Sequence, residues 1–366
     1  MNISSIKEVG LRGKRVILRA DFNLPMEKGV VVDDFRLERS MPTINFLKEQ
    51  GAKIIIMSYV STGRGTTLKP VADFFNDKYF KVGFLPTIEK EEVNNKISEM
   101  SEGDVLLLEN IHKNAEDREA DEKNDEEFAQ KLASFGDIFV NDAFGQSHRR
   151  YSSIIGIPKI LPSYAGFLME EEIAKLSDAF NPEHPFLLIL GGIKFESKLG
   201  VLDRFIEIAD KVFIGGALAN NFFKAQGIDI GDSLFDADVD ISHYLNNPKI
   251  LLPIDIKKRE GNILDCGDKT IEMLSKEINN SKFVLWNGPL GDFEDEAFDA
   301  GTKEIAEAIA ESSARAIIGG GDTVAAIHQS KAPCVKERCF VSTGGGAMLA
   351  FLADGTLPGI KTLQNI

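Results

Sequence analysis

Residues 315–323 read RAIIGGGDT, an apolar run that ends in three consecutive glycines, and the pattern returns at 341–347 as VSTGGGA. A glycine inside regular structure costs roughly 0.5–1 kcal/mol relative to alanine, so such runs need a compensating role. A turn from a strand into a helix supplies one, because its bare N–H groups bind an anion and glycine leaves room for it. Both segments therefore predict strand, turn and helix around a phosphate.

The same kind of apolar run recurs along the 366-residue chain, separated by polar segments of helix length. Runs with little alternation are typical of strands buried on both faces of a parallel sheet. The first batch comprises residues 15–19, 53–57, 104–109 and 137–140, and the second comprises 186–190, 211–215, 250–255, 283–288, 315–320 and 338–342. The chain is therefore predicted to be an α/β protein with two lobes.

A single helix is predicted between the two batches, over residues 169–180. This stretch has apolar residues near helical spacing and acidic residues in its first turn, and NPEHP at 181–185 ends it. Because ligands bind beyond the carboxyl ends of parallel strands, functional residues are expected just after the strands.

Composition excludes several classes of partner. The chain has 57 acidic and 42 basic residues, for a net charge of −15, which argues against nucleic acid or an anionic membrane. Three cysteines without a C-x-x-C pair indicate neither a disulfide framework nor a zinc site, and reduced thiols are expected. Residues 1–10 lack the apolar core of a leader and no run is long enough to span a membrane, so we expect a cytoplasmic protein.

Lysines follow the first predicted strand of the second lobe, in LGGIKFESK at 190–198. Lys194 and Lys198 are four residues apart at a helix start, where like charges repel each other and oppose the helix dipole. A bound phosphate chain would reverse both penalties. GGALANNF at 215–222 is a further glycine turn, which serves either a phosphate or close packing of helix on sheet.

Two carboxylates in the second lobe are candidate ligand groups. Asp322 directly follows the glycines of the opening segment, so it could hold Mg²⁺ beside phosphate oxygens, or it could simply cap the helix. Glu294, in WNGPLGDFE at 286–294, is a candidate for ribose hydroxyls or an exposed acid.

The first lobe carries arginines near its strand ends. RADFNLP at 19–25 brings Arg19, Asp21 and Asn23 together after a strand, and Arg36, Arg64 and Arg149 follow in other loops. Guanidinium groups bind phosphate and carboxylate through paired N–H donors. The charge run EDREADEKNDEE at 116–127 is interpreted instead as a solvated segment. Phosphoryl transfer across a cleft suits this division of groups, because catalysis there is positioning plus charge neutralisation.

Over nearly its whole length, the chain resembles the phosphoglycerate kinase family. The motifs that carry the resemblance, in the family's order, are RADFNLP, LLEN at 107–110, NDAFG at 141–145, HR at 148–149, LGGIKFESK, WNGPLGDFE, FDAGT at 298–302, IGGGDT and STGGGA. The resemblance implies two Rossmann-like three-layer (αβα) lobes with parallel sheets, joined by an interdomain helix and hinge. The implied parts are an acid-binding lobe at 1–168, a helix and linker at 169–184, a nucleotide lobe at 185–352, and a tail at 353–366 that returns to the first lobe.

The activity implied by the resemblance is glycolytic. A phosphoryl group passes reversibly from 1,3-bisphosphoglycerate to Mg·ADP, giving 3-phosphoglycerate and ATP, in a cytoplasmic monomer with Mg²⁺ as cofactor. The implied catalytic residues are Arg36, Lys194, Gly321 and Gly345. The implied acid-binding residues are Arg19, Asp21, Phe22, Asn23, Arg36, Tyr59, Arg64, His112, His148 and Arg149. The implied nucleotide-binding residues are Gly191, Gly192, Lys198, Gly215, Gly216, Asn287, Glu294, Gly320, Gly321, Asp322 and Thr323, with Asp322 also on the metal.

The chain departs from the family pattern in the acid-binding lobe. SYVSTGRG at 58–65 puts Tyr59 in place of a histidine, His112 stands where the family has an arginine, and Tyr151 stands where a second histidine is common. Loss of a hydrogen bond to a charged group is worth about 1.5–3 kcal/mol, so weaker binding of 3-phosphoglycerate is expected.

Two alternatives remain beside this interpretation, and two others are excluded. A divergent kinase could accept another acid, and a degenerate kinase could bind nucleotide without turnover. A nucleotide-cofactor oxidoreductase would need G-x-G-x-x-G, which the chain lacks. A P-loop enzyme is also excluded, because Arg15 follows the chain's one Gly-Lys pair at 13–14.

Overall fold

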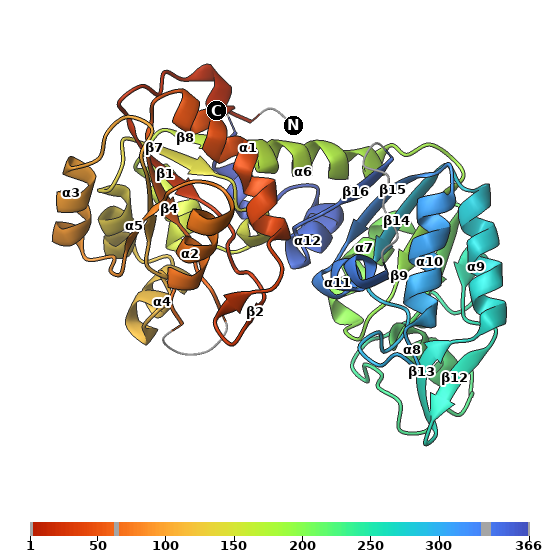
Figure 1. The fold of residues 1–366 in the computed structure, drawn as a ribbon. Coiled ribbons are helices and arrows are strands. Elements are labelled where there is room, and N and C mark those ends of the chain that lie inside the picture. Colours follow the sequence, from red (N-terminus) through yellow and green to blue (C-terminus); the bar gives the residue numbers. More distant parts are fainter. Residues whose placement is uncertain (1–2, 62–65, 331–337, 365–366) are drawn as a thin grey trace. The chain divides into compact units, whose positions relative to one another are not determined.

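The structure is a computed structural model that describes residues 3–61, 66–330 and 338–364. It consists of two compact units, Met1–Ile173 with Thr356–Ile366 (unit 1) and Ala174–Gly355 (unit 2). Helix α6 (Phe167–Ser177) carries the chain from unit 1 into unit 2 (Figure 1).

Unit 1 is built on a parallel sheet with the strand order β5-β6-β4-β1-β7-β8 across its described residues. The strands are β1 (Arg15–Arg19), β4 (Lys53–Met57), β5 (Gly83–Leu85), β6 (Val105–Leu108), β7 (Ile138–Asn141) and β8 (Ser163–Ala165), and a small hairpin is formed by β2 (Met26–Glu27) and β3 (Val30–Val31). The helices are α1 (Phe35–Glu49), α2 (Lys69–Lys78), α3 (Lys90–Ser98), α4 (Ala115–Glu122), α5 (Glu126–Ala133) and α13 (Pro358–Lys361).

Both faces of this sheet are covered by helices, because alternate residues of its strands pack into two different core clusters. Val16 and Ile54 pack into a core cluster with residues of α1 and α2. Ile17 and Ile55, one position further along each strand, pack into a second cluster with residues of α3 and α5. Since successive strand side chains point to opposite faces, these strands must be apolar at every position. This is the physical reason that the unbroken apolar runs predicted them correctly.

Unit 2 repeats the architecture with the order β11-β10-β9-β14-β15-β16 in its described part. Its strands are β9 (Phe186–Leu190), β10 (Lys211–Ile214), β11 (Ile250–Leu251), β14 (Phe283–Asn287), β15 (Arg315–Gly319) and β16 (Cys339–Val341), with a separate hairpin of β12 (Ile256–Arg259) and β13 (Asn262–Cys266). Its helices are α7 (Glu196–Phe205), α8 (Leu218–Ala225), α9 (Asp268–Asn280), α10 (Ala300–Glu311), α11 (Gly321–Ser330) and α12 (Gly346–Asp354).

The cores of unit 2 again lie on both sides of its sheet. Ile189 and Trp286 pack with residues of α9 and α10 on one face. On the other face, the ring of Phe186 contacts Phe205 of α7, with ring centroids 6.1 Å apart. The prediction of an α/β protein with two parallel sheets is therefore confirmed, and each predicted apolar run coincides with or overlaps a strand.

The last described residues lie beside the first ones in unit 1. Leu363 accepts a backbone hydrogen bond from Ser4 at 2.9 Å, and the Gly359 N–H donates to the Ser147 carbonyl at 2.9 Å. The chain thus passes from unit 2 back to unit 1 after residue 355.

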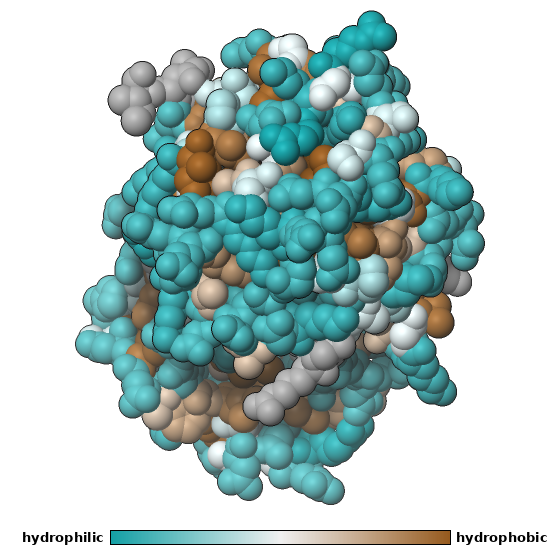
Figure 2. All heavy atoms as spheres, turned by 90° about the vertical axis from the view of Figure 1, so that its left-hand side faces the viewer, coloured by the Kyte–Doolittle hydropathy of each residue, from teal (hydrophilic) through white to brown (hydrophobic). Residues whose placement is uncertain are grey.

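Two further sequence expectations concern the cysteines and the surface. Cys266 is a buried free thiol, but Cys339 is disulfide-bonded, so the expectation that all three cysteines are reduced was wrong. No helix in the described ranges is both long and apolar enough to cross a membrane. Figure 2 shows one face of the molecule, on which hydrophilic residues cover most of the surface. This is consistent with the high content of charged residues in the sequence.

Candidate functional site

A cavity of about 820 Å³ lies at the carboxyl ends of the unit 2 strands. Turns that follow β9, β10, β14, β15 and β16 line it, as parallel packing of these strands requires. The sequence-predicted residues among its walls are Gly192, Lys194, Lys198, Gly216, Asn287, Glu294, Gly320, Gly321, Asp322, Thr323 and Gly345. Gly191 and Gly215 are not among the lining residues.

Close packing of three turns explains several of the glycines. The Gly191 N–H donates to the Asn287 carbonyl at 2.9 Å, and the Gly192 N–H donates to the Pro289 carbonyl at 2.7 Å. Gly288 has φ +99°, and a Cβ there would lie 2.2 Å from the Gly191 carbonyl oxygen. A Cβ on Gly215 would lie 2.7 Å from the side chain of Leu290, which fits the packing alternative at that position. These glycines let the turns touch one another behind the cavity wall.

Two other glycines leave open space at helix starts. Gly321 is the first residue of α11 and Gly345 precedes α12, and an added Cβ at either position would meet nothing within 4 Å. The first N–H groups of a helix have no partner within it, so they are free to bind an anion here. The cavity therefore receives two helix N-termini with room for a ligand beside them.

A side-chain hydrogen bond links the turn after β14 to the start of α11. The buried Oγ1 atom of Thr323 accepts a hydrogen bond from the Gly288 N–H at 2.9 Å. Nδ2 of Asn287 is buried in the cavity wall and has no hydrogen-bond partner among the described residues. Since buried polar groups are almost always paired, this donor is available to a ligand oxygen.

The charged residues that line the cavity are Lys194 and Lys198, together with the acids Asp232, Asp265, Asp292, Glu294 and Asp322. Burial lowers the pKa of Lys198, the nearby Lys194 lowers it further, and Asp322 opposes them. The negative charge of a bound phosphate would offset the cost of burying the Lys198 ammonium group. The described residues contain no group of three metal-ligating side chains, so a cation beside Asp322 would need phosphate oxygens among its ligands.

Sequence reasoning missed the apolar part of the cavity wall. It comes from α8, from the β12–β13 hairpin and from the turn after β14, through Phe223, Ile263, Leu264 and Leu290. Apolar walls with a few polar groups are typical of small-molecule sites. WNGPLGDFE marked the turn after β14 but not its leucine, and nothing in the sequence of the β12–β13 hairpin marks it as ligand-facing.

In unit 1, predicted residues from the loop after β1 meet the start of α1. The Arg36 guanidinium donates to the Asn23 carbonyl at 2.9 Å and lies 3.6 Å from the Asp21 carboxylate. Phe22, also expected at the site, is fully buried, packs on Phe75 and donates its N–H to the Ser58 hydroxyl, so the structure does not expose it to a ligand. Arg64 lies outside the described residues.

A polar chain joins the ends of three neighbouring strands, β4, β1 and β7. The Tyr59 hydroxyl donates to Gln146 at 2.6 Å, and the Gln146 amide donates to Asp21 at 3.3 Å. Burial, followed by the charge of Asp21, raises the pKa of Tyr59 to about 12. Arg19 lies over the Tyr59 ring at 5.5 Å, and its Nη2 atom is buried without a hydrogen-bond partner in the described part of the chain.

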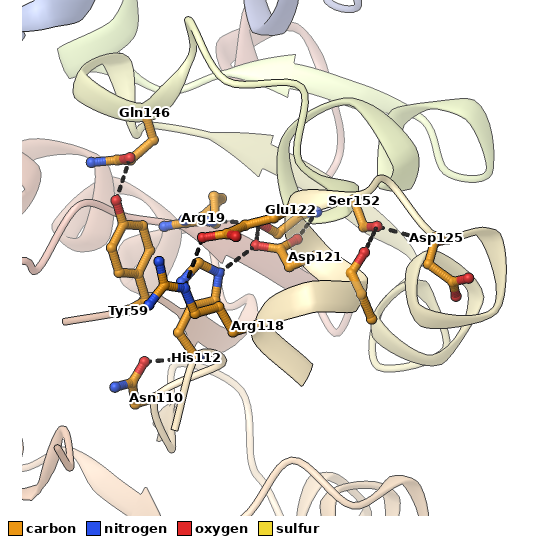
Figure 3. Close-up of polar contacts among 12 residues, drawn as sticks. Arg19, Tyr59, Asn110, His112, Arg118, Asp121, Glu122, Asp125, Gln146 and Ser152 are labelled. Atoms are coloured by element: carbon orange, nitrogen blue, oxygen red, sulfur yellow. Dashed lines mark hydrogen bonds and ion pairs between the residues drawn. The ribbon is translucent and has the colours of Figure 1, made fainter. Parts of the chain in front are cut away.

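His112 is enclosed by its neighbours. Its Nε2 atom lies 2.8 Å from a carboxylate oxygen of Asp121, and its side chain is 7% exposed. The ring stacks on Tyr59 with centroids 4.4 Å apart (Figure 3). Asp121 was not predicted as a site residue, because it lies within the charged run that was interpreted as a solvated segment.

His148 and Arg149 differ in what they offer to an anion. Burial, reinforced by the charge of Arg149, lowers the pKa of His148 to about 4, so its imidazole is neutral at pH 7. Arg149 is exposed and interacts electrostatically with Tyr59 and Tyr151. Of this pair, the arginine carries the charge.

Supporting residues in this region were also missed. The buried carboxylate of Glu109 accepts hydrogen bonds from the backbone of Leu68 and from Lys113, both at 2.9 Å. The Asn110 amide donates to the carbonyls of Val60 and Thr66. These two residues of LLEN therefore shape the loop after β4, and the motif was the signal that could have indicated them.

Helix N-termini and lysines around a cavity in one unit, and guanidinium groups at strand ends in the other, suit two phosphorylated ligands. Together with the parallel α/β architecture of each unit, they define a phosphotransferase. Comparison with known proteins makes this specific: residues 6–355 match the phosphoglycerate kinase family model.

Relatives and solved structures agree with this match. The phosphoglycerate kinase of Thermosipho africanus is 41% identical over 398 aligned residues, covering 99% of this chain and 98% of that protein. The phosphoglycerate kinase of Staphylococcus haemolyticus is 40% identical, covering 98% of each. The crystal structure of phosphoglycerate kinase from Pyrococcus horikoshii superposes with a TM-score of 0.86 at 31% identity, covering 99% of this chain and 98% of that one.

The chain belongs to the phosphoglycerate kinase family, and its function is the one for which that family is named. The expected resemblance is confirmed.

Proposed function

We propose that the chain transfers a phosphoryl group reversibly between 1,3-bisphosphoglycerate and Mg·ADP, with a carboxyl group as the acceptor in the ATP-consuming direction. The observation that carries this proposal is the division of anion-binding groups between the two units. Unit 2 offers helix N-termini and lysines around a cavity, and unit 1 offers guanidinium groups at its strand ends.

The unit 2 cavity is proposed to bind the nucleotide. Lys198 and the N–H groups at Gly321 would hold its phosphates, and Glu294 would accept hydrogen bonds from ribose hydroxyls. The apolar wall around Phe223 and Leu290 suits a flat heterocyclic base. The unpaired Asn287 amide supports a polar ligand close to the glycine turn.

The arginines at the strand ends of unit 1 are proposed to bind the phosphoglycerate. Arg36, Asp21 and Asn23 already contact one another, and Arg19 carries a buried N–H group without a partner. Arginine suits both ends of this substrate, because its paired donors match carboxylate and phosphate alike.

In the reaction, an oxygen of the ADP β-phosphate attacks the phosphorus of the acyl phosphate. The bond from phosphorus to the carboxyl oxygen breaks, and 3-phosphoglycerate leaves as a carboxylate. We propose that Arg36 and Lys194 neutralise the charge that spreads over the phosphoryl oxygens, while N–H groups at Gly321 and Gly345 donate to them. Movement about the connecting helix would bring the two ligands together and exclude water.

Mg²⁺ would be held by Asp322 with nucleotide phosphate oxygens, where it supplies charge neutralisation when bound. Asp322 fits this role because it lines the cavity beside Lys198, with which it interacts electrostatically. We further propose a monomeric enzyme of cytoplasmic glycolysis, in keeping with the family's activity.

A coupled assay with 3-phosphoglycerate and Mg·ATP tests the proposal across pH 6–8. Replacing Lys194 with alanine should lower kcat about 10²- to 10³-fold, as loss of one transition-state donor does, and should leave ATP affinity nearly unchanged. Lys276→Ala, at an exposed position of α9, is the matched control. Nucleotide binding without turnover in the unmodified chain would refute the proposed reaction.

A further inference from the structure

His112 stands where the family has a substrate-binding arginine, and its imidazole is paired with a carboxylate. His112 is 7% exposed and lies 2.8 Å from Asp121, a carboxylate that is itself fully buried. The other face of the ring stacks on Tyr59. A side chain enclosed in this way has little surface left for an anionic ligand.

Helix α4 brings another cation to the same place. Asp121 ties this helix to the site, because its carboxylate also accepts the Ser153 N–H at 2.7 Å and the Ser153 hydroxyl at 3.0 Å. Arg118 lies three residues before Asp121, and residues three apart share a face of a helix. Figure 3 shows the Arg118 side chain on the same side of α4 as Asp121, directed toward the Tyr59 and His112 rings.

Arg118 also acts on the two tyrosines that lie near the other arginines of unit 1. Arg118 interacts electrostatically with Tyr59 and Tyr151, and so does Arg149. Arg19 acts on Tyr59 from the buried side, where its Nη2 atom has no hydrogen-bond partner among the described residues. Three guanidinium groups therefore act on Tyr59, those of Arg118 and Arg149 from exposed side chains and that of Arg19 from the interior.

Arg118 is held weakly in the absence of a ligand. Its Nε atom donates to Glu122 at 2.8 Å, with the two side chains 62% and 37% exposed. Exposed pairs of this kind contribute little to stability, so a ligand oxygen can replace Glu122 at small cost. The guanidinium is then free to bind an anion through paired donors.

We propose that Arg118 is an additional binding residue for an anionic group of the acid substrate, and that it supplies the positive charge which the enclosed His112 cannot offer. This inference rests on the proposed phosphoglycerate reaction. Glu122 acts as the internal partner that Arg118 exchanges for substrate. The charge run at 116–127 is accordingly more than a solvated segment.

The test compares Arg118→Ala with the unmodified chain in the coupled assay and in calorimetric titration with 3-phosphoglycerate alone. We expect KM and Kd for 3-phosphoglycerate to rise about tenfold to hundredfold, with KM for ATP unchanged. Arg118→Lys should recover part of the affinity. Arg12→Ala is the control, because Arg12 forms an even more exposed surface pair with Glu102 elsewhere in unit 1.

Glu122→Ala separates a binding role from a structural one. If Arg118 binds substrate, removing its competitor should leave KM for 3-phosphoglycerate unchanged or lower it. If the pair only stabilises α4, both variants should raise KM equally, which would overturn the inference. Unchanged KM and Kd in Arg118→Ala would overturn it too, while the proposed reaction stands. Failure of the unmodified chain to bind 3-phosphoglycerate would instead refute the proposed substrate, and this inference with it.

Discussion

Asp142 is a buried carboxyl group at the start of the helix that leads from unit 1 into unit 2. Its Oδ1 atom accepts the N–H groups of Leu168 at 3.0 Å and Met169 at 3.2 Å. Its Oδ2 atom is buried with no hydrogen-bond partner in the described residues. Burial raises its pKa from 3.8 to about 7, although Thr43 and the two N–H groups act in the opposite direction.

This pKa makes folding favour the protonated carboxyl group. Between pH 4 and 7 the native state binds more protons than the unfolded chain, so the free energy of unfolding falls as the pH rises. One pKa unit corresponds to 1.36 kcal/mol, so a pKa raised from 3.8 to about 7 amounts to about 4 kcal/mol over the full window. About 2.5 kcal/mol of it is lost between pH 5 and 8.

Asp142→Asn tests this directly, because the amide keeps the Oδ1 acceptor and does not titrate. Urea unfolding followed by far-UV circular dichroism at pH 5, 6, 7 and 8 gives the difference in unfolding free energy between the two proteins. Other titrating groups cancel in that difference. We expect it to shift by about 2.5 kcal/mol in favour of the asparagine variant from pH 5 to pH 8. An equal difference at both ends of the range would refute the reasoning.

Three more predictions concern unit 2. Lys198→Ala should raise the Kd for ADP about tenfold to hundredfold in calorimetry, and an unchanged Kd would place the phosphates elsewhere. Gly288→Ala should lower thermal stability by about 1–3 kcal/mol, because its Cβ would lie 2.2 Å from the Gly191 carbonyl; retention of full stability would contradict the turn geometry. Thr323→Val leaves the Gly288 N–H without its acceptor and should cost about 1–3 kcal/mol in urea unfolding, whereas a cost near zero would show that the bond is dispensable.

The central strands of both sheets were predictable because burial on two faces makes every position apolar. KIIIM at 53–57 and FLLIL at 186–190 match β4 and β9 residue for residue. The edge strands of unit 1 and the hairpin strands carry no such signal. β5, β8 and β12 are short and partly exposed, so their pairing depends on neighbours that the local sequence does not reveal.

At the site, the chemistry of single residues was easier to predict than their partners. The glycine turns and lysines were assigned to an anion site, and the cavity brings most of them together. The sequence could not separate Gly321, which faces open space, from Gly215, which packs against Leu290. Both follow a strand, and only the neighbouring chain segments differ.

The amino-acid sequence by itself determined the two α/β units, their central strands and the glycine turns that follow them, because these depend on apolar runs and on glycine within a few residues. The tertiary structure alone decided that His112 pairs with Asp121, that Arg118 lies beside Tyr59, and that Asp142 caps α6. The last two of these features join segments that follow different strands, and the first joins a loop to a helix residue nine positions further along the chain. The burial and the charge of their neighbours, which set the properties of each side chain, arise only when the sheet brings those strand ends together.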